Sequence, residues 1–282
     1  MRVVACGLAT LDVVQVVDAL PAPDQKVVAR DLAVAFGGPA ANAAATAVAL
    51  GVPATLVTAL GRSPLGDLVR AALEERGVHV VDLLGGRAGA PAVSTVLVTA
   101  GTGERAVVST NATGTADVHD VARLLPAVLD DAGAVLVDGH HLAAGVRVAR
   151  AARAGVPVLL DGGSWKPGLE ELLAHVDLAL LSADFAAPGT AQVLPDLPGP
   201  AWVARSQGAG AVLVRGEADV VPPLVPADEV VDTLGAGDVL HGAMAAGLAR
   251  GLTPRTALEA AVDVASLSVR GRGALGWTAA IR

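Results

Sequence analysis

The chain has 282 residues with 28 acidic and 20 basic side chains and a formal net charge of −8, and it lacks the basic cluster that nucleic-acid phosphates demand, so we expect no nucleic-acid partner. Hydrophobic residues make up 53% of it, but the excess is alanine and valine, and no unbroken apolar run reaches the roughly 18 residues of a membrane span. The first residues lack the parts of a signal peptide, and the single Cys6 cannot form an intramolecular disulfide, which favours a soluble cytoplasmic protein with no membrane contact.

The N-terminal part of the chain predicts strands around a short turn. Residues 2–5 begin a β-branched run that ends at Gly7, and Asp12 follows soon after. Residues 13–35 contain two runs of β-forming residues separated by prolines, which is typical of two strands joined by a loop. The residues alone explain Asp12 as a solvated turn aspartate.

The next element is a glycine-bearing turn that leads into a helix. The run Gly37-Gly38-Pro39-Ala40-Ala41-Asn42 precedes an alanine-rich helix over residues 43–51, which a glycine closes. Gly38 has no side chain and therefore lets a ligand approach the backbone closely. Asn42 offers both a donor and an acceptor, and a plain helix-capping role is the alternative.

An alternation of strands and helices then predicts a parallel sheet covered by helices. The predicted elements are strand 55–60, helix 67–76, a hairpin of strands 92–100 and 105–110, strand 134–138, helix 143–154, strand 156–161, helix 169–173 and strand 178–181. Carboxylates follow three of the strands, at Asp138, Asp161 and Asp184, where open α/β sheets bind ligands. His140 and His141 lack a third ligand at a usable spacing, which argues against a zinc site.

Two further glycine-containing segments follow. Strands 201–204 and 211–214 flank the loop Arg205-Ser206-Gln207-Gly208-Ala209-Gly210. The stretch Asp232-Thr233-Leu234-Gly235-Ala236-Gly237-Asp238 forms a turn that opens a helix, and the free N–H groups and positive dipole end there favour a phosphate. Asp238 is also explained as an ordinary first-turn charge, so the turn alone does not decide its role. Thr253 caps a last helix over residues 253–269.

Two of these motifs together resemble one known family, the ribokinase-like sugar kinases or PfkB family. Residues 232–238 match every specified position of the family's C-terminal signature Asp-Thr-x-Gly-Ala-Gly-Asp, and residues 37–42 match its N-terminal Gly-Gly-x-x-x-Asn. The resemblance covers about residues 1–275. It implies an α/β fold, a ribokinase-like three-layer sandwich forming a single domain over residues 1–282, with a mostly parallel central sheet. It also implies a small β lid built from about residues 13–35 and 91–110.

The family resemblance implies a sugar site. By position, Asp12, Gly38 and Asn42 match the family's sugar-binding residues, and the acceptor-only carboxylate suits a polyol. Asn111 stands where relatives often have an asparagine that reaches the substrate, with a turn asparagine as the alternative. Asp238 also contacts the substrate in this scheme, because it accepts the proton of the hydroxyl that is phosphorylated.

The same resemblance implies ATP-dependent phosphorylation of that hydroxyl. The N–H groups of Gly235, Ala236 and Gly237 stabilise charge on the transferring phosphoryl group, and positioning and electrostatics supply most of the catalysis. A helix N-terminus lowers a carboxylate pKa, so we expect Asp238 to be a weak base, which a loose transition state tolerates.

Nucleotide and metal sites are likewise carried over from the family. Residues 205–210 resemble its nucleotide loop, which assigns to ATP the residues Ser206, Gly208 and Gly210, together with Gly235 and Gly237. Asp184 stands in for the glutamate of the family's Asn-x-x-Glu, which helps hold Mg²⁺ through water. Asp232 and Thr233 match the loop that binds a monovalent cation, which predicts activation by K⁺. Independently of the resemblance, Lys166 is either a cation near the phosphates or a solvated lysine.

Three other functions compete with a sugar kinase. A nucleoside kinase of the same fold is disfavoured by the scarcity of aromatic residues. A non-catalytic sugar or nucleotide sensor is disfavoured by the intact Asp238 and favoured by the altered stretches 182–185 and 205–210. A dinucleotide-binding oxidoreductase fails because no Gly-x-Gly-x-x-Gly follows the first strand. We also expect a homodimer formed through the lid.

Overall fold

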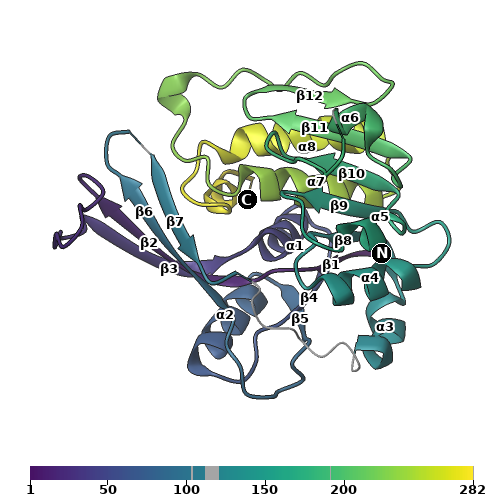
Figure 1. Cartoon of the computed structure of the whole chain (residues 1–282), viewed down its shortest axis with the longest axis horizontal. Helices are drawn as coiled ribbons and strands as arrows, with labels where there is room; N and C mark the ends of the chain where they lie inside the picture. The colour runs from purple at the N-terminus through teal and green to yellow at the C-terminus, as the bar shows by residue number, and fades with distance from the viewer. Residues whose placement is uncertain (103, 112–120, 191, 282) are drawn as a thin grey trace.

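The computed structural model describes residues 1–102, 104–111, 121–190 and 192–281, which form two sheets with helices packed on the larger one (Figure 1). The strands are β1 Arg2–Cys6, β2 Thr10–Val17, β3 Asp31–Gly37, β4 Ala54–Thr58, β5 Val78–Asp82, β6 Ala92–Thr99, β7 Arg105–Ser109, β8 Ala132–Val137, β9 Val158–Gly162, β10 Leu178–Leu181, β11 Trp202–Gln207 and β12 Gly210–Val214. The α-helices are α1 Pro39–Ala49, α2 Pro64–Glu75, α3 Val121–Leu129, α4 Leu142–Ala151, α5 Leu169–Leu173, α6 Val193–Asp196, α7 Ala236–Ala249 and α8 Pro254–Ser268. Two 3₁₀ helices, η1 Ala227–Glu229 and η2 Gly276–Ile281, complete the described elements.

The larger sheet is mostly parallel. Its strand order is β12-β11-β10-β9-β8-β1-β4-β5, and among these pairs only β11 and β12 run antiparallel. Parallel strands place their carboxyl ends at one edge, which is where open α/β sheets bind ligands. The segments that follow β1, β8, β9 and β10 therefore meet at this edge.

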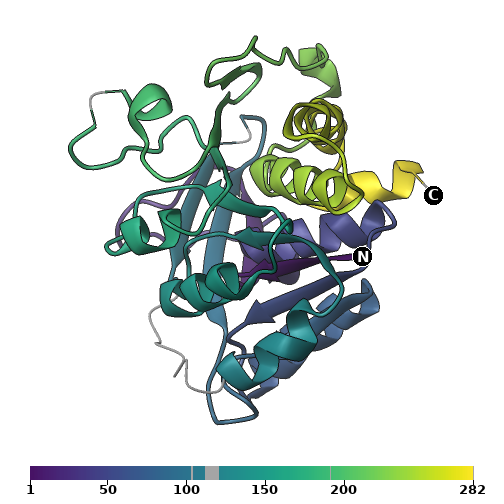
Figure 2. The ribbon, with the colours of Figure 1, turned by 90° about the vertical axis from the view of Figure 1, so that its right-hand side faces the viewer.

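Helices cover both faces of the larger sheet, as the side view in Figure 2 makes visible. On β1, Val3 and Ala5 belong to the core beneath α1, α7 and α8, whereas Val4 and Cys6 belong to the core beneath α3, α4 and α5. This alternation is the period of two that a strand imposes, and burial of both faces explains the continuous apolar run. Cys6 is buried as expected, and burial raises the pKa of its thiol.

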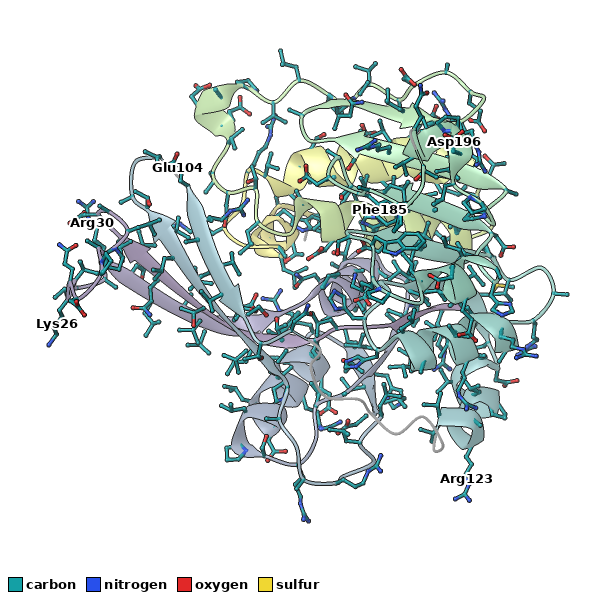
Figure 3. The ribbon with its side chains drawn as sticks, viewed as in Figure 1. Lys26, Arg30, Glu104, Arg123, Phe185 and Asp196 are labelled. Atoms are coloured by element: carbon teal, nitrogen blue, oxygen red, sulfur yellow. The ribbon has the colours of Figure 1, made fainter. Side chains whose placement is uncertain are left out.

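The smaller sheet contains the two segments that were predicted to form a lid, and it is called the lid below. Its order is β3-β2-β6-β7, with β2 and β6 parallel and the two outer pairs antiparallel. The sheet projects away from the helices (Figure 1), and its far end carries Lys26, Arg30 and Glu104 (Figure 3). The two predicted lid segments therefore do form one separate sheet, and its strands extend from Thr10–Val17 on one side to Arg105–Ser109 on the other.

The start of α1 differs from the prediction, and a capping role for Asn42 is wrong. The helix begins at Pro39 with Gly38 as its N-cap, so Asn42 lies within the helix. Proline at the first helical position has its φ preset for a helix and lacks the N–H that would go unpaired there, and alanines continue the helix readily. The two glycines alone form the turn, which brings Asn42 close behind it.

Other boundaries moved by a few residues. The loop predicted between strands 201–204 and 211–214 is wrong, because β11 continues to Gln207 and only a two-residue turn remains before Gly210. Strand β5 was not predicted, whereas the Thr253 cap of α8 is confirmed by its hydroxyl, which accepts the N–H of Thr256. None of the helices in the described ranges is both long and apolar enough to cross a lipid bilayer.

Candidate active site

The turn before α7 is held in place by glycine geometry and by one carboxylate. Gly235 has a φ of 75°, and a Cβ there would collide with Ala274, so only glycine fits. The Asp232 carboxylate accepts the N–H groups of Leu234 and Gly273, both at 2.8 Å, and so fixes the turn to the segment after α8. A Cβ at Gly237, by contrast, would have no protein atom within 4 Å. Open space therefore lies over Gly237.

The N–H groups of this turn differ in their availability. Among the described residues, those of Gly235, Gly237 and Asp238 have no acceptor. The N–H of Ala236 donates to the carbonyl oxygen of Thr233 at 3.3 Å, so the expectation that it would be free for a phosphoryl group is not met. Free N–H groups at the start of a helix form an anion site, and here they border the open space over Gly237.

Asp238 lies in the first turn of α7, and its carboxylate accepts a hydrogen bond of 2.7 Å from the side-chain amide of Asn42. The residue is half-buried. Burial raises the pKa of this carboxyl to about 7, the nearby Asp161 carboxylate adds to the rise, and the Asn42 hydrogen bond opposes it. The prediction that the helix N-terminus makes Asp238 a weak base with a lowered pKa is therefore wrong. Desolvation of the carboxylate outweighs the helix dipole and raises the pKa.

The Gly-Gly motif makes room for Asp12. A Cβ at Gly37 would overlap the Asp12 carboxylate, and at Gly38, whose φ is 95°, it would collide with the carbonyl of Leu8. Burial raises the pKa of Asp12, and hydrogen bonds from the Thr10 and Ser94 hydroxyls oppose the rise. The Gly-Gly-x-x-x-Asn motif therefore contacts two carboxylates: Gly37 borders Asp12, and Asn42 donates to Asp238.

Asp138 has a structural role that the sequence did not reveal: its carboxylate connects three backbone segments. Its carboxylate accepts the N–H groups of Leu8 at 2.8 Å, Ala40 at 3.2 Å and His140 at 2.8 Å. It therefore ties the turn after β1 to the start of α1, and a Cβ at Gly7 would overlap it. Lys166 lies beside it, with its ammonium donating to the Asp138 carbonyl at 3.4 Å, which places a cation at the carboxyl ends of the strands.

The predicted Mg²⁺ residue lies on the loop after β10. Phe185, labelled in Figure 3, is fully buried and packs edge-on against Trp165 with a centroid distance of 6.2 Å, which leaves Asp184 exposed next to it. Within the described chain Asp184 has no hydrogen bond or ion pair, so its oxygens are available to a hydrated cation. Arg205 of β11 donates to the carbonyl of Ala183 and holds this loop.

The residues assigned to ATP from the nucleotide loop sit in and beside a tight turn. Gly208 has a φ of 59° in the turn between β11 and β12, and Gly210 opens β12. Ser206 is part of β11, and its hydroxyl donates to the carbonyl of Leu181 at 3.3 Å. Ser206, Gly208 and Gly210 thus lie at or just after the end of β11, next to the carboxyl end of the parallel strand β10.

The lid reaches the site at two points. Asp12 pairs with Ser94 in the lid register and Ser94 with Ser109, and Asn111 follows two residues later with a φ of 51° and an N–H bonded to the Ser109 hydroxyl. From the other end of β7, the guanidinium of Arg105 donates to the Thr233 hydroxyl at 3.1 Å. The same guanidinium lies 3.9 Å from the Asp232 carboxylate.

Two contributors to the site were missed at the sequence level. Arg105 and His241 carry no local pattern that marks them, because their partners at Thr233, Leu180 and Asp161 are distant in the chain. From the sequence alone, an arginine on a strand such as Arg105 is explained as a solvated side chain, and a histidine within an apolar helix such as His241 as an ordinary core residue. Only the fold brings them to the signature turn.

Comparison with known proteins shows the family and the fold of the chain. The sequence profile of the pfkB family of carbohydrate kinases matches residues 1–278. Ribokinase of Arabidopsis thaliana is 28% identical over 302 residues, which cover 96% of this chain and 77% of that protein. The structure of Arabidopsis thaliana ribokinase complexed with ribose and ATP has a TM-score of 0.73 at 24% identity, covering 98% of this chain and 95% of that one. Adenosine kinase from Sinorhizobium meliloti is also similar, with a TM-score of 0.74 at 20% identity and coverage of 100% and 98%.

Proposed function

Because the chain belongs to the pfkB family of carbohydrate kinases and transfers a phosphoryl group to a sugar hydroxyl, we propose that Asp238 is its general base and that a small ribose-type sugar is its substrate. The observation that carries the proposal is the Asp238 carboxylate at the start of α7, beside free N–H groups and open space over Gly237. The choice of a ribose-type sugar follows from the likeness to a plant ribokinase.

In the proposed mechanism, Asp238 accepts the proton of the attacking sugar hydroxyl. The sugar oxygen forms a bond to the γ-phosphorus of ATP while the bond from that phosphorus to the bridging oxygen of ADP breaks. A base works best with a pKa near the working pH, and burial raises the pKa of Asp238 to about 7. The Asn42 amide holds the carboxylate in one orientation during the transfer.

The anion site would receive the phosphoryl group. The N–H groups of Gly235, Gly237 and Asp238 are proposed to bind its oxygens, since they have no acceptor among the described residues. Glycine at 237 keeps the space above the turn open to the ligand. Mg²⁺, when bound with ATP, supplies neutralising charge at the phosphates, and the exposed Asp184 carboxylate would hold it through water.

The remaining site residues are assigned to the two substrates. Asp12, Gly38 and Asn42 would bind the sugar at the base of the lid, and Asn111 lies at the end of a lid strand from which it would complete that site. The turn with Ser206, Gly208 and Gly210 would lie against ATP. Each of these assignments rests on motif position together with placement at the carboxyl edge of the sheet or at the base of the lid.

A monovalent cation is proposed beside the same turn. Asp232 and backbone carbonyl oxygens near Thr233 would supply the oxygen ligands that K⁺ prefers. Arg105 competes for this place, because its guanidinium already contacts the Thr233 hydroxyl and lies 3.9 Å from Asp232. We place the reaction in the cytoplasm, where a free thiol such as that of Cys6 stays reduced.

A homodimer through the lid is proposed from its exposed apolar side chains. On the edge strands β3 and β7, Leu32, Val34, Val107 and Val108 are 51–75% exposed. Exposed edge strands pair readily with a second copy of the same chain. Light scattering at micromolar concentration should give twice the chain mass, and Val108→Lys should give a monomer; a monomeric wild type would remove this part of the proposal.

The experiment that tests the function is a coupled ADP-release screen. Wild-type enzyme with ATP and Mg²⁺ is offered aldoses, ketoses and nucleosides, each at one fixed concentration. We expect turnover with a pentose or another small sugar and little with nucleosides. Turnover confined to adenosine would identify a nucleoside kinase instead, and binding of sugar without turnover would identify a sensor.

A further inference from the structure

His241 is a buried histidine whose two ring nitrogens both face carbonyl oxygens. It lies on α7, one helical turn after Gly237, and is 5% exposed. Its Nδ1 is 2.7 Å from the carbonyl oxygen of Gly237, and its Nε2 is 2.8 Å from the carbonyl oxygen of Leu180 at the end of β10. The ring thus bridges the signature turn and the strand that precedes the Asp184 loop.

These two contacts constrain the protonation of the ring. A carbonyl oxygen only accepts hydrogen bonds, and a neutral imidazole has one N–H and one lone pair. In either neutral tautomer one nitrogen would turn its lone pair toward a carbonyl oxygen at hydrogen-bond distance, which is repulsive. Both contacts are attractive only when each nitrogen carries a hydrogen, which is the imidazolium form.

Asp161 supplies the opposite charge. It is the last residue but one of β9 and is 6% exposed, and its Oδ2 lies 3.5 Å from His241 Nδ1 with no hydrogen-bond partner among the described residues. A buried carboxylate oxygen without a partner is costly unless a cation is nearby. The imidazolium therefore compensates the buried charge of the carboxylate, and neither side chain is assigned to a substrate in the proposed mechanism.

The surrounding charges come from α7 and from the loops after β8 and β9. Asp238 on α7 and Asp138 after β8 lie on the acidic side, and His140 and Lys166 on the neighbouring loops lie near Asp161. Burial raises the pKa of Asp161, and the charge of His241 is the largest of the influences that lower it. The cluster would carry excess negative charge if the ring were neutral.

We propose that His241 is held as an imidazolium paired with Asp161 and acts as a positioning residue for phosphoryl transfer, a role that rests on the proposed function. Its Nδ1–H binds the carbonyl of the peptide that joins Gly237 to Asp238, so it fixes the direction of the Asp238 N–H. Its Nε2–H ties that peptide to the end of β10. Its charge adds to the positive end of the α7 dipole where the phosphoryl group arrives.

The first arm of the test reads the ring directly and needs no substrate. Full-length protein labelled with ¹⁵N-histidine is titrated while the two-bond proton–nitrogen correlations of its rings are recorded. In the pH range about one unit above the ordinary histidine pKa of about 6.5, His241 should still show two protonated nitrogens. In Asp161→Asn the ring should show only one protonated nitrogen over the same range. A neutral His241 in the wild type over that range overturns the inference.

The second arm separates positioning from folding. His241→Gln should lower kcat about 10- to 100-fold, the scale of a slightly misplaced catalytic group, while the KM values for sugar and ATP stay within about twofold. His79→Gln on the exposed face of β5 is the matched control and should keep wild-type kcat. An unchanged kcat in a folded His241→Gln also overturns the role. If the wild type phosphorylates no sugar, the proposed function fails, whereas the ring measurement still decides the state of His241.

Discussion

The side-chain amide of Asn42 donates a 2.7 Å hydrogen bond to the carboxylate of Asp238, although the two residues are 196 positions apart in the chain. One belongs to the N-terminal glycine motif and the other to the C-terminal signature, so this bond joins the two motifs in one site. It also acts on the chemistry, because it favours the charged form of a carboxyl whose pKa burial raises to about 7.

Asn42→Ala should move the pH profile of kcat. Removal of the amide takes away an influence that lowers the pKa of Asp238, so that pKa rises and the acidic limb of the profile shifts to higher pH. Activity relative to wild type should therefore fall most at about pH 6 and recover at about pH 9. A full pH series on both enzymes checks this, and an equal loss at every pH would show that Asn42 does not act on the charge of Asp238.

Gly237→Ala should separate stability from activity. The residue is helical and a Cβ there meets no protein atom within 4 Å, so alanine should leave stability unchanged or raise it by up to about 1 kcal/mol. The same methyl would occupy the space proposed for the phosphoryl group, so kcat/KM for ATP should fall by about 10²-fold or more.

Gly145→Ala on α4 is the matched control for that substitution. It adds the same methyl to a helical glycine, where it would make ordinary contacts of 3.9 Å to Leu172 and 4.0 Å to Val137. Melting temperature and steady-state rates of both variants are measured together. If Gly237→Ala keeps the rate of Gly145→Ala, no ligand uses the space over Gly237.

Asp12→Asn should weaken sugar binding alone. The carboxylate sits over Gly37 at the base of the lid and accepts the Thr10 hydroxyl at 2.5 Å, so the amide replaces it without a change of size. We expect the sugar KM to rise about tenfold or more, the loss expected from a charged hydrogen bond, with an unchanged KM for ATP. Equal effects on both substrates would place Asp12 in a structural role.

Much of this arrangement could be predicted from the sequence because it is local. The signature turn, the Gly-Gly motif and the alternation of strands and helices each depend on neighbouring residues. They led to the correct fold, to Asn42 and Asp238, which contact each other, and to Asp12, which borders Gly37. Asn42 within α1 was missed for a local reason, since Pro39 starts the helix earlier than the alanine run suggested.

The rest depends on distances that no local pattern encodes. The sequence predicted a lowered pKa for Asp238, whereas the structure raises it. The helix dipole can be inferred from the sequence, but burial and the proximity of Asp161 cannot. The brace formed by Asp138 and the contact from Arg105 to Thr233 join segments about 100 residues apart or more. The nucleotide loop became a tight turn because β11 pairs with β12 as far as Gln207.

Potassium should activate the enzyme if a cation binds beside Asp232. Exchange of Na⁺ for K⁺ at constant ionic strength should raise kcat, and Asp232→Ala should abolish that response. Arg105→Met removes the competing guanidinium and should enlarge the response. Equal rates in the two salts for wild type and Arg105→Met, with protein free of carried-over K⁺, would remove the cation site.

The most direct test of Asp238 as the base is the turnover of Asp238→Asn with the sugar identified by the screen. Asparagine keeps the size of the side chain and cannot accept the proton, so kcat should fall by about 10²-fold or more, with the sugar KM nearly unchanged. Removal of a buried charge should also leave the variant at least as stable as wild type at about pH 8, above the raised pKa. A folded Asp238→Asn enzyme whose kcat stays within about threefold of wild type would contradict the account.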